Sequence, residues 1–442
     1  MHRIVVIGGG TAGTTAAFYA RRTRRDCEII VVERERYPMY SRCGLPFAIS
    51  GEVPAESLVE FPPDLYERTM KVKLLLNTEV VEVDPSSKKV VLSADGRMKE
   101  LSFDKLILAT GAEPIIPRFM RGCSQVYVLR TINDALAIRQ KARSSKKAVI
   151  VGAGLIGLEV ADALSKLGLE VIIFEMKDQV VPLGLDHDLA SQVAEHLRSH
   201  GVALHLSSPV EAIEEHNGKL HVSSSTVSEE ADFAVVAVGV RGVVSLAEKM
   251  GIELGPTGLI KVNSRMETSL PDIYAAGDCV ESLGLITGKP RVFQLATTAA
   301  RQGVVAGINA AGGNARYKGF VGSTVFKAFD LEVAYAGLTE QAAKDEGFSV
   351  KSSKVTVSFR ARYMPHAPIS VKLIAEEESH RVVGVQAVGA GASWQVDLAA
   401  ISMMHGAKVE DLAYLETCYA PAVASIWSPL SAAAQALLRK LR

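Results

Sequence analysis

The chain has 442 residues, in which 49 Lys and Arg residues balance 49 Asp and Glu residues. This length predicts two or three domains, each with its own hydrophobic core. The neutral charge balance gives no support to nucleic acid or an anionic membrane as a partner, and we expect neither.

Cysteine usage and the N-terminus both bear on the compartment. Five cysteines, an odd number scattered along the chain, fit neither a secreted disulfide framework nor a zinc pattern, so we predict no metal site. The chain enters an apolar strand at once, and no apolar run approaches ~18 residues, so we expect neither a signal peptide nor a membrane span. A reducing, cytoplasmic location fits best.

The N-terminal stretch predicts a strand, a glycine turn, a helix and a second strand. Apolar residues 4–7 enter a GxGxxG turn formed by Gly8, Gly10 and Gly13, and residues 29–32 then lead to Glu33. In such a unit the glycines let a pyrophosphate approach backbone amides, and the acid binds a ribose hydroxyl. We therefore predict a first dinucleotide site at this turn.

A single cysteine follows ten residues after Glu33, within residues 40–46, and we interpret Cys43 as a redox cysteine beside that dinucleotide. Residues 47–49 could open a helix whose N-terminus favours a thiolate. Ala48 stands where a C-x4-C dithiol needs its second cysteine, so the oxidised form must be a mixed disulfide or a sulfenic acid. The alternative is a buried structural cysteine.

The same plan is written a second time. Apolar residues 148–151 enter a turn with Gly152, Gly154 and Gly157, and a second strand leads to Glu175. Residues 72–84 match 202–214 at an offset of 130, and residues 104–111 match 232–239 at an offset of 128. Because a complete strand–GxGxxG–helix–strand–acid unit occurs twice, we predict two dinucleotides in two domains.

Further positions are predicted to face the dinucleotides. The matched strands end at Thr110, Gly111 and Gly239, where a glycine could face a bound dinucleotide. Residues 271–278 predict an apolar strand that ends in Gly277-Asp278, and Asp278 could bind a sugar-alcohol hydroxyl; a helix or turn cap is the alternative. The small residues of 294–308 suit a helix packed beside a flat cofactor or, alternatively, a plain core helix.

The rest of the chain has a different pattern. Residues 132–142 predict a helix between the two modules. Strands at 355–359, 369–374 and 382–388 predict an antiparallel sheet, followed by helices at 396–405 and 409–415. The apolar segment 422–438, interrupted by Pro429, predicts a packing helix.

With these motifs in this order, the sequence resembles the flavoprotein pyridine-nucleotide disulfide oxidoreductases over essentially its whole length. The resemblance implies an α/β fold with two Rossmann-like domains, for FAD and NAD(P)H, and a C-terminal α+β dimerisation domain. The implied boundaries are 1–112 and 245–322 for the FAD domain, 113–244 for the NAD(P)H domain and 323–442 for the dimerisation domain.

Absence of the C-x4-C pair places the chain in the single-cysteine branch of that family. The branch includes coenzyme A disulfide reductases, persulfide reductases, NADH oxidases and NADH peroxidases. Peroxidase-type members carry a histidine where this chain has Thr11. In the reductases two tyrosines of the partner subunit lie near the cysteine, and Tyr363 and Tyr419 look like their counterparts.

The resemblance implies an FAD-dependent NAD(P)H:disulfide oxidoreductase that acts on a small-molecule disulfide or persulfide and forms a homodimer. Electrons pass from NAD(P)H through FAD to Cys43. Glu159 could position the nicotinamide, or could be a plain surface carboxylate. Glu175 favours NADH, because a carboxylate repels a 2′-phosphate.

Basic residues give an independent indication of coenzyme A. Arg22, Arg42 and Lys71 could bind its phosphates by charge-assisted hydrogen bonds, although Arg22 also suits an ordinary helix end. Two other hypotheses stay open: an NADH oxidase that cycles Cys43 through a sulfenic acid, and a flavin redox sensor with low turnover.

Overall fold

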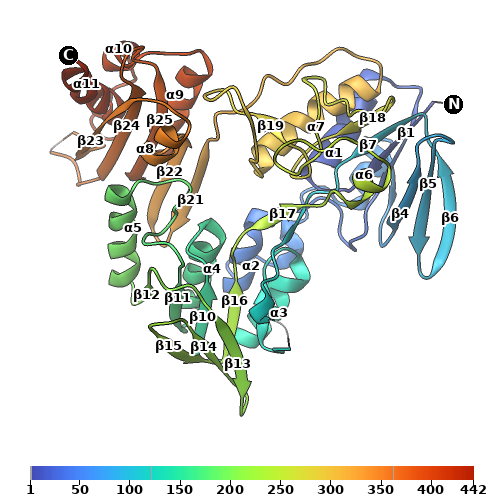
Figure 1. The fold of residues 1–442 in the computed structure, drawn as a ribbon, viewed down its shortest axis with the longest axis horizontal. Helices are drawn as coiled ribbons and strands as arrows, with labels where there is room; N and C mark the ends of the chain where they lie inside the picture. The colour runs from blue at the N-terminus through green and yellow to red at the C-terminus, as the bar shows by residue number, and fades with distance from the viewer. Residues whose placement is uncertain (1, 121, 362) are drawn as a thin grey trace. The chain divides into compact units, whose positions relative to one another are not determined.

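The computed structural model describes residues 2–120, 122–361 and 363–442, and these residues form two compact units (Figure 1). The first unit comprises residues 1–45, 53–115 and 240–320; the second comprises residues 46–52, 116–239 and 321–442. The mixed α/β fold class is confirmed. The predicted boundaries between an NAD(P)H domain and a dimerisation domain stay a prediction.

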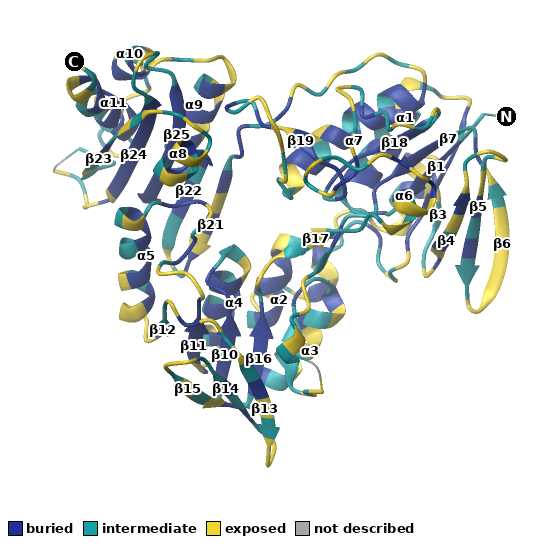
Figure 2. Cartoon of the chain, in the orientation of Figure 1, coloured by how far each residue is buried: buried dark blue, intermediate teal, exposed yellow. Residues whose placement is uncertain are grey.

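A five-stranded parallel sheet forms the centre of the first unit, in the order β18-β7-β1-β2-β3. Its strands are β1 (Arg3–Ile7), β2 (Glu28–Val32), β3 (Lys73–Leu75), β7 (Lys105–Leu108) and β18 (Ile273–Ala275). Most of its strand residues are buried, as the dark strands in Figure 2 show. Covered parallel strands are continuous apolar runs in sequence, which is the pattern of residues 4–7 and 29–32.

Two long helices lie together on one face of this sheet. They are α1 (Thr11–Thr23) and α7 (Ala296–Ala310). A Cβ atom at Gly303 would lie 2.4 Å from the carbonyl oxygen of Ala12, and one at Gly307 would lie 2.1 Å from that of Ala16. The small residues of α7 therefore serve close packing against α1, so the core-helix alternative is the better account of this run.

The first unit also carries a separate antiparallel sheet and several short elements. The sheet consists of β4 (Glu79–Asp84), β5 (Lys89–Ala94) and β6 (Arg97–Ser102), of which β6 is largely exposed (Figure 2). The short elements are β8 (Ala112–Pro114), β17 (Val240–Gly242), α6 (Ser245–Lys249), β19 (Ser282–Leu283) and β20 (Pro290–Arg291).

The second unit repeats the plan of the first. Its parallel sheet has the order β9-β16-β10-β11-β12, with β9 (Val126–Val128), β10 (Lys147–Val151), β11 (Glu170–Phe174), β12 (Ala203–His205) and β16 (Phe233–Val236). The sequence offset of 130 carries β3 onto β12, and the offset of 128 carries β7 onto β16. Duplication in the sequence is therefore duplication of four strands of the sheet, whereas the fifth strands, β18 and β9, hold the same sheet position but come from different places in the chain.

Helices and a small sheet complete this repeat. They are α3 (Ile132–Ala142), α4 (Leu155–Lys166), α5 (His187–Ser199), β13 (Ala212–His216), β14 (Lys219–Ser223) and β15 (Ser228–Ala231). The helix predicted over residues 132–142 is confirmed with both of its ends. A capping box fixes the start of α3, because Thr131 accepts from the Asp134 amide while the Asp134 carboxylate accepts from the Thr131 amide.

The C-terminal part of the second unit contains an antiparallel sheet in the order β21-β22-β25-β24-β23, as predicted. Its elements are β21 (Thr324–Ala328), β22 (Leu331–Gly337), α8 (Glu340–Asp345), β23 (Val350–Ser358), β24 (Pro368–Glu376), β25 (Val382–Gly389), α9 (Ala392–Met404), α10 (Val409–Ala413) and α11 (Pro429–Leu441).

The prediction of one helix over residues 422–438 is wrong in its start. Pro429 does not interrupt the helix but is the first residue of α11, and Ser428 caps the helix by accepting from the Ser431 amide at 3.0 Å. Proline fits this first position because its missing N–H has no intrahelical partner to lose. Within the residues that the structure describes, no helix is long and apolar enough to cross a membrane.

Candidate redox site with two dinucleotide cradles

The two glycine turns have matching geometry. Gly8 and Gly152 have φ values of 103° and 107°, a region that favours glycine, and a Cβ at either residue would collide with the carbonyl of Ala109 or Ala237. A Cβ at Gly13 would likewise lie 1.9 Å from the Gly8 oxygen, so tight packing within the turn requires a glycine at this position.

The middle glycines differ from their neighbours in a way that suits a ligand. Gly10 and Gly154 have extended backbones, and a Cβ at either position would meet no protein atom within 4 Å. They are also the N-cap residues of α1 and α4, and neither helix start has a side-chain cap. The open space in front of unsatisfied helix amides fits a pyrophosphate in each module.

The acids at the ends of β2 and β11 hold their turns by the same two hydrogen bonds. Glu33 accepts from the Gly9 amide at 2.6 Å and from the Glu35 amide at 2.8 Å. Glu175 accepts from the Ala153 amide at 2.7 Å and from the Lys177 amide at 2.8 Å. Both carboxylates are buried, and burial raises the pKa of Glu33.

Other predicted cofactor residues lie around the first turn. The Thr110 hydroxyl donates to the Val243 carbonyl at 2.6 Å, and Gly111 has a φ of 71°. Gly277, which precedes Asp278, packs on Ala12 at the start of α1, so the backbone of Asp278 lies near the first glycine turn. In the second module, Gly239 follows β16 with a φ of 112°.

Cys43 is exposed and lies in the 3₁₀ turn Arg42–Gly44, directly before α2 (Leu45–Ser50). Its neighbour Arg42 binds Glu35 at 2.7 Å and the Tyr40 hydroxyl at 2.7 Å, and the Tyr40 hydroxyl donates to Glu35 at 2.7 Å. Since the Glu35 amide binds Glu33, hydrogen bonds run from the first glycine turn to the residue beside Cys43.

Sequence reasoning missed the roles of Tyr40 and Glu35 in this network. The signal available was an acid two residues after Glu33 and an arginine adjacent to Cys43. The Glu35 carboxylate forms an ion pair with the Arg42 guanidinium, so an anionic substrate would have to compete with Glu35 for Arg42.

The remaining predicted substrate residues, Arg22 and Lys71, lie at the C-terminal end of α1. Arg21 donates to the carbonyl oxygen of Lys71 at 2.8 Å, which ties the Lys71 backbone to the helix end that carries Arg22. The Arg22 guanidinium lies over the Phe18 ring, 5.5 Å from its centroid. Both Arg22 and Lys71 are exposed, so this end of α1 presents positive charge to solvent.

Three cysteines outside the site have the properties of unreactive thiols. Cys27 and Cys279 are buried, Cys123 is half-buried, and burial raises the pKa of all three. Cys418 is exposed and precedes Tyr419.

Tyr363 and Tyr419 come together from distant parts of the second unit. The Ala361 amide donates to the Pro421 carbonyl at 3.2 Å, which joins the two segments. The phenols share a hydrogen bond, and this bond with Tyr419 raises the pKa of Tyr363. Their exposed fractions of 76% and 50% leave both phenols open to solvent on this chain.

Glu159 lies on α4, two residues after Gly157. Burial raises the pKa of its carboxyl to about 7, and the nearby Asp162 carboxylate adds to the rise. A carboxyl with this pKa can change its protonation state near neutral pH, which a plain surface carboxylate would not do.

The chain belongs to the pyridine nucleotide-disulphide oxidoreductases. The model of this family matches residues 2–303, and the model of the family's dimerisation domain matches residues 323–429. The recognition of this FAD- and NAD(P)H-dependent family from the sequence is confirmed.

Three similar proteins show the range of activities among its relatives. The chain is 38% identical to an NADH oxidase of Methanocaldococcus jannaschii, over 99% of both chains. It is 33% identical to the NAD(P)H sulfur oxidoreductase (CoA-dependent) of Pyrococcus abyssi, over 98% of both chains. The structure of an NAD-dependent persulfide reductase from A. fulgidus matches with a TM-score of 0.96 and 36% identity, over 99% of this chain and 83% of that one.

The duplicated cradles predict that Gly10→Val and Gly154→Val affect different cofactors. Each valine enters open space on an extended backbone, so both variants should fold. Gly10→Val should remove bound FAD, as measured by flavin absorbance of the purified protein. Gly154→Val should keep FAD and raise the KM for NADH by about tenfold or more. Each variant is the control for the other, and loss of the same cofactor in both would contradict the assignment.

The raised pKa of Glu159 predicts a pH-dependent stability. Between its ordinary value of 4.5 and about 7, the folded state holds a proton that the unfolded state has lost, so stability falls as pH rises through this window. Glu159→Gln removes this loss. The thermal midpoint of this variant should rise relative to that of the parent protein from about pH 5 to pH 7.5. The difference in the free energy of unfolding should reach up to about 3 kcal/mol and stay constant above this pH.

The matched control is Glu170→Gln, since Glu170 is an exposed carboxylate of the same unit that pairs with Lys147. In thermal scans without nicotinamide nucleotide, the difference in thermal midpoint between this variant and the parent protein should not grow with pH. A Glu159→Gln variant that tracks the parent protein at every pH would contradict the pKa.

Proposed function

We propose that this protein is an FAD-dependent NAD(P)H:disulfide oxidoreductase that reduces coenzyme A disulfide, or a coenzyme A persulfide or polysulfide, through Cys43. The observation that carries the proposal is the exposed Cys43, whose neighbour Arg42 is tied by hydrogen bonds to the first glycine turn. Ala48 stands where a second thiol of the same segment would be required, so we assign the other half of the disulfide to a small thiol.

The proposed chemistry needs only one protein thiol. Bound FAD would accept a hydride from NAD(P)H and pass the electron pair to sulfur. The Cys43 thiolate attacks one sulfur of the substrate disulfide, a mixed disulfide forms, and the other half leaves as a thiolate. Two electrons then cleave the mixed disulfide, release the second thiolate and restore the Cys43 thiolate.

Positive charge at the end of α1 supports a phosphorylated thiol. Coenzyme A carries several phosphate charges, and we assign Arg22 and Lys71 to them, with Arg42 as a third contact if Glu35 yields its guanidinium. The names of the Pyrococcus abyssi and A. fulgidus relatives support the same class of substrate. We assign NADH as the preferred nucleotide, because the Glu175 carboxylate disfavours a 2′-phosphate.

The proposal includes a homodimer with composite sites. Large apolar side chains are exposed on the part of the chain that matches the dimerisation domain, namely Trp394, Ile401, Met404, Ile426 and Trp427. Exposed apolar groups of this size support an interface. Tyr363 and Tyr419 would then face the partner subunit's Cys43, where one phenol can protonate the leaving thiolate.

A reducing, cytoplasmic location completes the proposal. Its support is the chemistry of the thiol, because an oxidising compartment would work against a reductant of disulfides.

The name of the Methanocaldococcus jannaschii relative favours a second candidate, an NADH oxidase. In that reaction Cys43 would form a sulfenic acid and no coenzyme A would be needed. Oxygen uptake with NADH alone, at a rate equal to disulfide turnover, would favour the oxidase.

Replacement of Cys43 tests the proposal directly. Cys43→Ser should retain FAD and NADH binding and lose disulfide reduction, because a hydroxyl cannot form the mixed disulfide. Mass analysis of the unreduced parent protein should find a coenzyme A adduct on the Cys43 peptide. Cys123→Ser, which removes a half-buried thiol of raised pKa, should behave like the parent protein. Full disulfide reductase activity in Cys43→Ser would refute the mechanism.

The tyrosine pair has its own test. A Tyr363→Phe, Tyr419→Phe double variant keeps the rings and removes both hydroxyls. Reduction of the flavin by NADH should stay normal, while disulfide turnover slows by roughly 10²-fold, as expected for loss of a general acid. Tyr414→Phe, at an exposed tyrosine of the same region, is the matched control. Undiminished turnover in the double variant would leave the tyrosines as packing residues.

A further inference from the structure

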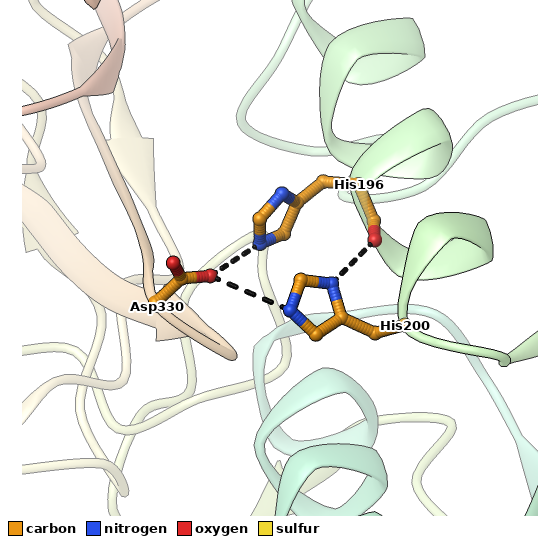
Figure 3. A group of neighbouring side chains, drawn as sticks. All are labelled: His196, His200 and Asp330. Atoms are coloured by element: carbon orange, nitrogen blue, oxygen red, sulfur yellow. Dashed lines mark hydrogen bonds and ion pairs between the residues drawn. The ribbon is translucent and has the colours of Figure 1, made fainter. Parts of the chain in front are cut away.

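Three side chains that the proposed reaction does not use converge in the second unit: His196, His200 and Asp330 (Figure 3). The Nε2 atoms of the histidines lie 2.8 and 3.6 Å from the Oδ1 atom of Asp330. All three atoms lie within 4.8 Å of one another. Sequence reasoning passed over this group, although a His-x3-His pair in a helical pattern was visible.

The histidines come from the last turn of α5, and the carboxylate comes from another part of the unit. Four residues separate His196 from His200, so the two rings lie on one side of the helix end. Asp330 lies in the two-residue turn between β21 and β22. The group therefore joins the helix of the second module to the antiparallel sheet.

A hydrogen bond orients the His200 ring. Its Nδ1 atom lies 2.9 Å from the His196 carbonyl oxygen, which can only accept, so Nδ1 carries a proton (Figure 3). In the neutral ring, Nε2 then presents its lone pair towards the Asp330 carboxylate. An Nδ1–H bound to a carbonyl oxygen is the usual support of a metal-binding histidine.

The turn that carries Asp330 has an unusual backbone. Phe329 has a φ of 59°, at a hairpin position where glycine or asparagine is favoured. Its ring lies 4.6 Å from the His200 ring, measured between centroids. A bulky residue with a left-handed backbone conformation is strained, and such strain persists where the surrounding structure holds the backbone in one geometry. Here that geometry brings Asp330 to the two imidazoles.

We propose that His196, His200 and Asp330 bind a divalent transition metal of the zinc class. Two imidazole nitrogens and a carboxylate oxygen are zinc ligands, and tetrahedral bonds of about 2.0–2.2 Å separate ligand atoms by roughly 3.3–3.6 Å. The His200–Asp330 separation of 3.6 Å agrees with this range, and the His196–Asp330 separation of 2.8 Å, a hydrogen-bond distance, would lengthen on metal binding. The negative end of the α5 dipole also favours a cation at this position.

The bound metal acts as a clip between α5 and the β21–β22 hairpin. Asp330 has an exposed fraction of 81%, so water can complete the coordination and the ion can exchange with solvent. The role is structural, because none of the three residues belongs to the glycine turns, the Cys43 segment or the tyrosine pair. A proton shared by a histidine and Asp330 is the competing account of the same contacts.

Zinc titration of the full-length, flavin-loaded protein tests the proposal after chelator treatment and removal of any affinity tag. Competition with a chromogenic chelator at about pH 7.5 should give one site per chain. The single variants His196→Asn, His200→Asn and Asp330→Asn should each weaken this site by about tenfold or more. Zinc should raise the thermal midpoint of the parent protein and not that of these variants.

A second histidine pair provides the matched control. His216 and His221 lie on β13 and β14 with ring centroids 5.7 Å apart, and each pairs with a glutamate. The His216→Asn, His221→Asn double variant should bind zinc like the parent protein. Unchanged zinc affinity in the three single variants would mean that thiols or other groups bind the ion, and would overturn the proposal. Parent affinity weaker than about 0.1 mM would favour the shared proton and overturn it too.

Discussion

The hydrogen bond between a buried carboxylate and the amide of a glycine turn is the constraint on which both modules depend. Glu33 and Glu175 each end a strand and reach back to the turn after the neighbouring strand. The acid thus fixes the turn in the shape that exposes the helix amides, so the strand pairing and the cradle are set by one interaction. The Glu35 amide donates to Glu33, and the Glu35 carboxylate accepts from Arg42, so the same network also constrains where the Cys43 segment lies.

Much of this arrangement could be predicted from sequence, because it depends on local pattern. A repeat of apolar runs and glycines at constant offsets predicts a repeated sheet, and β12 and β16 hold the positions in the second sheet that β3 and β7 hold in the first. The helix at 132–142 was predictable because its cap residues adjoin it in sequence. The start of α11 was not, because an apolar run does not reveal that Pro429 is the first helical residue.

Contacts between distant side chains were beyond such reasoning. The small residues of α7 have the same composition whether they face a cofactor or another helix, and only the position of Ala12 and Ala16 decides between the two. Tyr363 and Tyr419 were named through family resemblance, since nothing in their local sequence indicates that their phenols meet. Asp330 joins His196 only after the hairpin turn is formed, and a backbone strained at Phe329 has no signature in composition.

The discontinuous first unit has a consequence for synthesis of the protein. Helix α1 and strand β7 leave the ribosome early, but their partners α7 and β18 follow only after the whole second glycine module. At 5–20 residues per second, the roughly 200 residues between β7 and the end of α7 take on the order of 10–40 s to make. During that interval the apolar face of α1 and the outer edge of β7 have no native cover. We therefore expect the nascent chain to expose apolar surface to aggregation, and to chaperones, for longer than a protein of continuous domains does.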